Sequence, residues 1–117
     1  MRSIVEEKSI AFAHRIMDCT DYIMAKHKKY SLCDQLFRSG TSIGANIAES
    51  INAQSKADFV SKLSISLKEA TETKYWLELL HDSGNISDQQ FDSVVNDLNV
   101  IIGTLIKTIK KTRENGI

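Results

Sequence analysis

The sequence predicts an all-α protein, an antiparallel up-down-up-down four-helix bundle in which residues 1–117 form a single domain. Three observations support this fold class. The 117 residues include no proline and only five glycines, so long uninterrupted helices are possible throughout. Apolar residues recur at intervals of three and four in four successive segments, which is typical of helices with one buried face. A chain of this length can bury one core but is too short for two.

The first two helices are predicted from their apolar faces. The first is expected over residues 2–28, and its face comprises Val5, Phe12, Ile16 and Ile23 with the neighbouring Met17 and Met24. The second is expected to start at a capping serine, Ser31, which precedes Asp34 by three residues. The apolar face of the second helix comprises Leu32, Leu36, Ile43, Ile47 and Ile51.

The third and fourth helices also begin at capping serines, Ser55 before Asp58 and Ser87 before Gln90. The third helix is expected over residues 56–82, with Phe59, Leu63, Leu67, Ala70, Leu77 and Leu80 on its face. The fourth has Phe91, Val94, Leu98, Ile102, Leu105 and Ile109 on its face. Gly84 is expected to close the third helix in a left-handed conformation. Short links between such helices make neighbours antiparallel.

The second and third helices have more apolar surface than one small core requires. The residues expected at a subunit contact are Phe37, Gly44, Ala48 and Trp76. Gly40, Gly44 and Ala48 also follow one another at four-residue spacing, which allows another helix to approach closely. We interpret this surface as a contact between copies of the chain. A broad edge of a single core is the alternative interpretation.

Segment 38–50 has a helical period but is rich in small polar residues. At about 100° per residue, one stripe of this helix contains Arg38, Ser42, Asn46 and Glu49. On the third helix, Glu69 and Glu72 lie one turn apart, where they could meet Arg38 across helices or subunits. Two interpretations stay open, a polar contact strip for a partner and a buried hydrogen-bond network that fixes packing.

Basic residues cluster at the ends of two helices. The first cluster comprises Lys26, Lys28 and Lys29, and the second comprises Lys107, Lys110, Lys111 and Arg113. In an antiparallel bundle the clusters lie at opposite poles. Each has two interpretations, favourable charges at a helix C-terminus or a surface for the phosphates of RNA or DNA. With 15 basic and 15 acidic side chains in the whole chain, nucleic-acid affinity depends on these local clusters.

The sequence has no pattern typical of a catalytic site. It lacks a phosphate-binding glycine loop, zinc-type cysteine spacing and a nucleophile beside a base. A di-metal bundle site requires two Glu-x-x-His pairs, and the chain has one, Glu78 with His81. Cys19 and Cys33 are expected as free thiols about 10 Å apart along the bundle. We therefore expect no catalytic residues, metal or cofactor.

Membrane insertion and secretion are not expected. No stretch reaches the roughly 18 to 20 continuous apolar residues of a membrane span. Charged residues such as Glu6, Glu7 and Arg15 interrupt the first 25 residues, where a secretory signal would need an apolar core. We therefore expect a cytoplasmic protein.

Residues 36–49, LFRSGTSIGANIAE, resemble the signature of a bacterial four-helix bundle family known as S23 ribosomal proteins or 23S rRNA intervening-sequence proteins. Residues 58–80, DFVSKLSISLKEATETKYWLELL, are similar to the third helix of that family. The resemblance implies a toroidal homo-oligomer, usually a pentamer, with a nucleic-acid-associated role. Related accessory proteins of diversity-generating retroelements form basic barrels that bind nucleic acid and a reverse transcriptase. By position, the resemblance covers the six polar residues of the second and third helices named above, together with Trp76.

These observations predict a non-enzymatic oligomer, with a pentamer favoured, that binds RNA or DNA or associates with the ribosome or its RNA. The alternative is a scaffold that binds a protein partner without nucleic acid. Nucleic-acid binding that weakens steeply with salt would favour the first function. A protein partner that co-purifies in stoichiometric amount without nucleic acid would favour the second.

Overall fold

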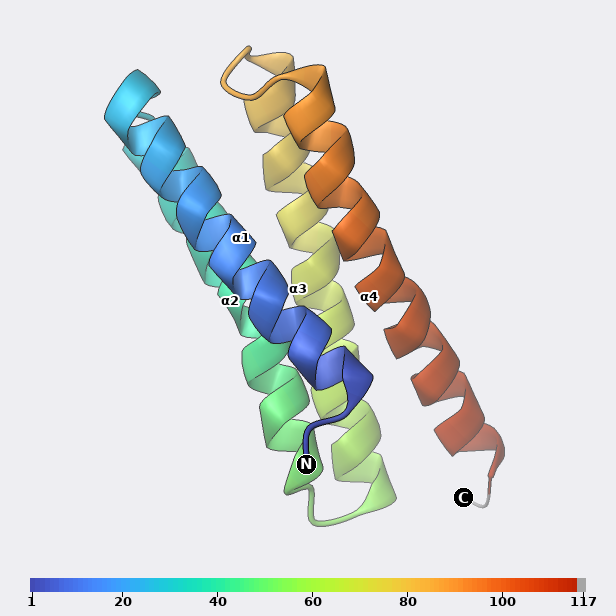
Figure 1. Cartoon of the computed structure of the whole chain (residues 1–117). Coiled ribbons are helices and arrows are strands. Elements are labelled where there is room, and N and C mark those ends of the chain that lie inside the picture. The colour runs from blue at the N-terminus through green and yellow to red at the C-terminus, as the bar shows by residue number, and fades with distance from the viewer. Residues whose placement is uncertain (116–117) are drawn as a thin grey trace.

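The structure is a computed structural model that describes residues 1–115, and it confirms the predicted bundle of four antiparallel helices (Figure 1). The helices are α1 (Ile4–His27), α2 (Tyr30–Ile51), α3 (Lys56–Asp82) and α4 (Asp88–Glu114). They form a rod of 49 × 24 × 21 Å. The α1–α2 and α3–α4 links lie at one end, here called the two-link pole. The α2–α3 link, the start of α1 and the end of α4 lie at the other end, the terminal pole.

Serine caps start three of the helices. Ser55 and Ser87 accept hydrogen bonds from backbone amides three residues ahead, as predicted. Ser3 and Glu6 form a capping box at the start of α1, which we did not predict. Gly84 has a φ of 78°, the left-handed conformation expected of it. These caps satisfy amide and carbonyl groups that a helix end would otherwise leave unpaired.

The predicted cap at Ser31 is wrong. The helix α2 begins at Tyr30, so its N-cap residue is Lys29 rather than Ser31. Lys29 makes no side-chain capping bond. Lys28 adopts a left-handed conformation with a φ of 54°, and its amide bonds back to the last turn of α1. The chain therefore reverses within two residues, and Ser31 already lies inside the helix.

Each helix contributes to the core through residues that alternate at spacings of three and four, the pattern of left-handed bundle packing. In α3 these buried residues are Val60, Leu63, Ser66, Ala70, Thr73, Leu77 and Leu80. The residues predicted on the apolar faces are buried or packed against the core except Ile51, which is 58% exposed, and Met17, which is 40% exposed. Ile51 is the last residue of α2, so its side chain lies at the edge of the core.

Two glycines bring α1 close to α2. A Cβ atom built on Gly40 would lie 2.9 Å from both γ carbons of Ile16, and one on Gly44 would lie 3.1 Å from Ser9 Oγ. The small residues predicted to admit a neighbouring helix thus admit α1 of the same chain. Ala48, the third member of that series, is exposed.

Buried hydroxyl groups join α2 to α3, and sequence analysis did not identify them. Ser66 Oγ donates a hydrogen bond of 2.8 Å to the carbonyl oxygen of Ile43. Thr73 Oγ1 and Ser39 Oγ are hydrogen bonded at 3.0 Å. Bonds of this kind contribute about 0.5–1.5 kcal/mol each and, unlike apolar contacts, require one particular alignment of the two helices.

At the surface, Arg15 connects α1 to α4. Its Nη1 lies 2.7 Å from Asp97 Oδ2, and its Nη2 lies 3.1 Å from Ser93 Oγ. Both members of the ion pair are substantially exposed, so we expect it to contribute at most about 1 kcal/mol. The contact joins residues far apart in sequence and fixes how α4 lies against α1.

Candidate functional site

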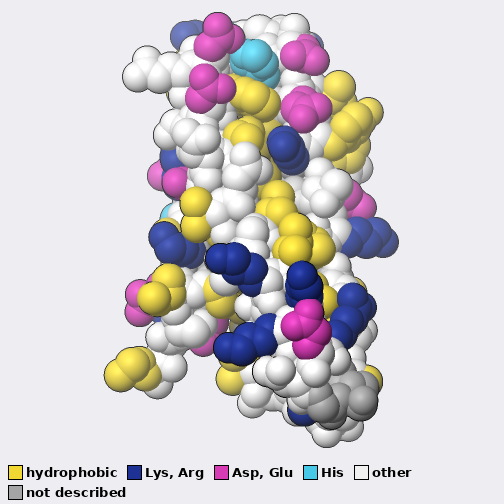
Figure 2. Space-filling view, turned by 90° about the vertical axis from the view of Figure 1, so that its right-hand side faces the viewer, with side chains coloured by type: hydrophobic (Ala, Val, Ile, Leu, Met, Phe, Trp, Pro, Cys, Tyr) yellow, Lys and Arg dark blue, Asp and Glu magenta, His cyan; other side chains and the backbone are white. Residues whose placement is uncertain are grey.

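The four predicted basic residues of α4 are exposed at the terminal pole: Lys107, Lys110, Lys111 and Arg113. Within residues 1–115, their side chains form no ion pair or hydrogen bond. Figure 2 shows Lys and Arg side chains gathered over this half of the α4 face and Asp and Glu side chains at the opposite end. The positive charge of this α4 cluster is therefore available to an external anion.

A groove of about 340 Å³ lies beside the α4 cluster, between α3 and α4. Its lining residues are Ser64, Leu67, Ile106, Ile109, Lys110, Arg113 and Glu114. Ile106 is 51% exposed, so part of the apolar lining is open to solvent. Lys56 Nζ donates a 2.7 Å hydrogen bond to the carbonyl oxygen of Asn115, which holds the start of α3 beside the end of α4.

The other basic cluster, Lys26, Lys28 and Lys29, lies at the two-link pole and is exposed. Lys26 Nζ lies 3.2 Å from Tyr22 Oη and 5.4 Å from the centre of the same ring. Lys28 provides the left-handed C-cap of α1. Lys29 is the N-cap residue of α2, so the three lysines lie around the α1–α2 link.

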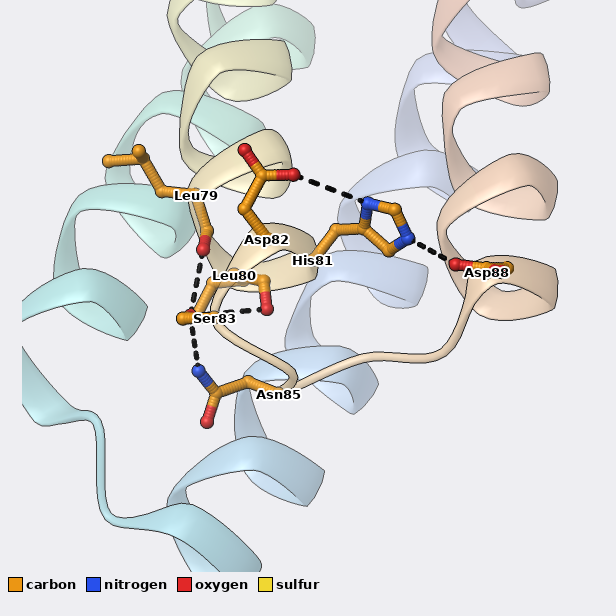
Figure 3. Close-up of polar contacts among 7 residues, drawn as sticks. All are labelled: Leu79, Leu80, His81, Asp82, Ser83, Asn85 and Asp88. Atoms are coloured by element: carbon orange, nitrogen blue, oxygen red, sulfur yellow. Dashed lines mark hydrogen bonds and ion pairs between the residues drawn. The ribbon is translucent and has the colours of Figure 1, made fainter.

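Acidic residues surround His81 at the two-link pole (Figure 3). His81 Nε2 lies 2.5 Å from Asp88 Oδ1, and its Nδ1 lies 3.6 Å from Asp82 Oδ1. The ring stacks on Phe91 at 4.5 Å. The hydrogen bond to Asp88 raises the pKa of His81, burial opposes the rise, and the charges of Asp88, Asp82 and Asp92 add to it. Three carboxylates therefore lie near His81 at the pole that also contains Lys26, Lys28 and Lys29.

We expect His81 to make stability depend on pH. Folding raises its pKa, so the protonated ring stabilises the fold fully below the unfolded value of about 6.5. This stabilisation is lost as pH rises through the folded-state pKa. His81→Gln should remove the dependence between about pH 6 and 8 in urea unfolding, and His14→Gln, at an exposed position, should retain it. A wild-type protein that matches His81→Gln across this range would contradict the assignment.

The predicted polar residues of α2 bond mainly to groups on the same helix. Arg38 Nε lies 3.2 Å from Asp34 Oδ2, one turn earlier on the same helix. Ser42 Oγ donates to the carbonyl of Arg38 at 2.6 Å, and Asn46 Nδ2 donates to the carbonyl of Ser42 at 2.9 Å. Within the described chain, Arg38, Ser42 and Asn46 therefore bond along α2 rather than across to another helix.

The glutamates of the predicted network have different surroundings. Glu49 Oε1 pairs with Lys62 Nζ of α3 at 3.1 Å. Glu69 and Glu72 line a polar groove of about 460 Å³ together with Arg38 and other α2 residues. Burial raises the pKa of the Glu69 carboxyl, Glu72 adds to the rise, and Lys68 opposes it. The structure thus brings Arg38, Ser42, Glu69 and Glu72 to one groove and leaves Glu49 in a separate ion pair.

Exposed apolar and small residues form a stripe along α2. Tyr30, Phe37 and Ile51 are spaced at multiples of seven residues, and Ala48 lies on the same side of the helix. Tyr30 is 59% exposed and Phe37 is 43% exposed. We call Tyr30, Phe37, Ala48 and Ile51 the α2 stripe. A groove of about 390 Å³ between α1 and α2 adds Met17 and Met24 beside it.

The other two residues predicted at a contact lie elsewhere. Gly44 faces Ser9 of its own chain, as described above. Trp76 is half-buried on α3 and packs against the core, with its ring 5.0 Å from that of Tyr75. Its indole N–H is buried and has no hydrogen-bond partner in the described part of the chain. Of the four predicted contact residues, Phe37 and Ala48 thus share one exposed surface.

The cysteines are free thiols, as predicted. Burial raises the pKa of Cys19 to about 11, with a contribution from Cys33, and so disfavours the reactive thiolate. Cys33 Sγ lies 3.9 Å from the carbonyl oxygen of Thr20, the residue that follows Cys19. Because α2 starts at Tyr30, directly after a two-residue link, Cys33 of α2 lies beside Thr20 of α1.

The described residues contain neither a cluster of metal ligands nor a membrane-spanning helix. Among residues 1–115, no three His, Cys, Asp or Glu side chains are grouped so as to hold a metal ion. His81, the histidine of the single Glu-x-x-His pair, faces Asp82 and Asp88 instead. None of the described helices is long and apolar enough to cross a membrane.

Comparisons with known proteins agree with this architecture. A family model described as 23S rRNA-intervening sequence protein matches residues 1–107. A crystal structure of a protein of unknown function, from the S23 ribosomal protein family of Bacteroides thetaiotaomicron VPI-5482, matches with a TM-score of 0.90 and 48% identity. The match covers 92% of this chain and 99% of that chain. No curated protein matches significantly. The chain belongs to the 23S rRNA-intervening sequence protein family.

Proposed function

We propose that the protein is a non-enzymatic oligomer, with five copies in a ring, that binds RNA or DNA through the phosphate backbone. The observation that carries this proposal is the α4 cluster, four exposed cations with no acidic partner among the described residues. Unpaired Lys and Arg side chains on one surface are the electrostatic requirement for phosphate binding. The family name refers to an intervening sequence of 23S rRNA, which makes RNA the first ligand to test.

The oligomeric part of the proposal depends on the α2 stripe. Exposed apolar residues along one side of a helix are typical of a surface that packs against a second helix. In a closed ring of identical protomers, equivalent poles lie on the same face of the ring. The α4 clusters would then act together, and a modest patch on each protomer would become a multivalent surface.

Binding rather than catalysis fits the roles of the polar side chains. Arg38, Glu49 and His81 are each engaged by a neighbouring charged residue. Burial raises the pKa of the Cys19 thiol above the range in which it would act as a nucleophile at neutral pH. These side chains support the fold and its surface, and the α4 cluster is left for an external ligand.

A salt series with labelled RNA and DNA pools of mixed sequence tests nucleic-acid binding. If the four cations of one α4 cluster contact phosphates, affinity should fall roughly 100-fold between about 50 and 200 mM salt. Binding that is absent, or that salt does not change, would contradict the proposal. A protein that co-purifies in stoichiometric amount while nucleic acid is absent would instead support the scaffold function.

A further inference from the structure

The two poles of the protomer differ in local charge. At the two-link pole, Asp82, Asp88 and Asp92 lie close enough to His81 to raise its pKa. At the terminal pole, the α4 cluster has no ion-pair partner among residues 1–115, and Figure 2 shows basic side chains gathered in that half of the α4 face. The cations of the terminal pole are therefore free to attract a polyanion, whereas the lysines of the two-link pole share their pole with three carboxylates.

The groove beside the α4 cluster combines cations with apolar surface. Its charged lining residues are Lys110, Arg113 and Glu114, so cations outnumber the single carboxylate, and its apolar lining residues are Leu67, Ile106 and Ile109. Ile106, Lys110 and Arg113 follow one another at spacings of four and three on α4, so they lie along one side of the helix. A ligand in this groove meets positive charge and exposed aliphatic surface together.

We propose that this α3–α4 groove binds single-stranded nucleic acid, with phosphates on Lys110 and Arg113 and an unstacked base against Leu67 and Ile106. The inference rests on the proposed function and assigns it to one pole and one strand type. In a duplex the bases are stacked inside, so only phosphates would reach the groove. A single strand can place both a base and its phosphates there, and this gives it the more favourable fit.

The test compares two matched double variants, each lacking two cations. The double variant Lys110→Gln with Arg113→Gln should bind a labelled single-stranded RNA of about 20 nucleotides roughly 10-fold more weakly. The slope of log affinity against log salt concentration should become shallower by about 1.4. Lys28→Gln with Lys29→Gln, at the two-link pole, should leave both quantities unchanged. Ile106→Ser should reduce affinity for the single strand several-fold but leave the matching duplex unaffected. Circular dichroism checks that each variant keeps the wild-type helix content.

The outcomes separate this inference from the proposed function. If wild-type protein binds RNA and only the Lys28 and Lys29 variant loses affinity, the groove assignment is wrong while nucleic-acid binding stands. Equal affinity for single strand and duplex, unchanged by Ile106→Ser, would also overturn the assignment. If wild-type protein binds neither RNA nor DNA but binds phosphatidylserine vesicles, both proposals are wrong.

Discussion

Phe37→Asp should convert the assembly into protomers of 13.1 kDa. Phe37 is at the middle of the α2 stripe and is 43% exposed in the isolated protomer. If a second copy covers the stripe, the substitution places an unpaired carboxylate in an apolar contact, which is costly. Light scattering at fixed protein concentration measures the change in mass.

The matched control for this change is Val100→Asp. Val100 is also half-exposed but belongs to α4, away from the α2 stripe. It should keep the wild-type mass, because the proposed contact does not include it. Both variants should keep the wild-type helix content. An assembly that survives Phe37→Asp unchanged would show that the α2 stripe is not the contact.

Gly40→Leu should reduce the free energy of unfolding by about 3 kcal/mol, at the upper end of the usual range for an overpacked core. Even a Cβ atom at this position would lie 2.9 Å from two carbons of Ile16, which is fully buried. The larger side chain must push α1 away from α2 or displace Ile16. Urea unfolding followed by circular dichroism gives the difference directly.

Gly103→Ala is the opposite control. No atom lies within 4 Å of a Cβ built on Gly103, which is exposed in α4. The added methyl group should stabilise the protein by about 0.5–1 kcal/mol through helix propensity alone. Equal stability of the Gly40→Leu variant and the wild-type protein would contradict the close packing of α1 and α2.

The fold could be predicted because the features that determine it, apolar spacing and helix caps, are local in sequence and recur in each helix. Apolar spacing marked every helix, and serines such as Ser55 and Ser87 marked two helix starts correctly. The start of α2 was missed because it depends on the left-handed backbone of Lys28, which no local residue pattern indicated. Ile51 was wrongly assigned to the core because periodicity does not show where a helix ends relative to its neighbours.

The candidate site was less predictable because it depends on tertiary contacts. Helical spacing placed Arg38 and Ser42 on one side of α2, but could not show that Arg38 pairs with Asp34. The buried hydroxyls of Ser66 and Thr73 occupy core positions in α3, a weak signal that we did not use. The α3–α4 groove beside the basic cluster joins residues distant in sequence, so its composition required the structure.

The central claim is that several copies of this chain associate and that the assembly binds nucleic acid. Light scattering of the purified wild-type protein, with and without single-stranded RNA at low salt, tests both parts in one measurement. We predict a mass five times that of the 13.1 kDa protomer, which increases when RNA is added. A single protomer at high protein concentration, with a mass that RNA does not change, would contradict the claim.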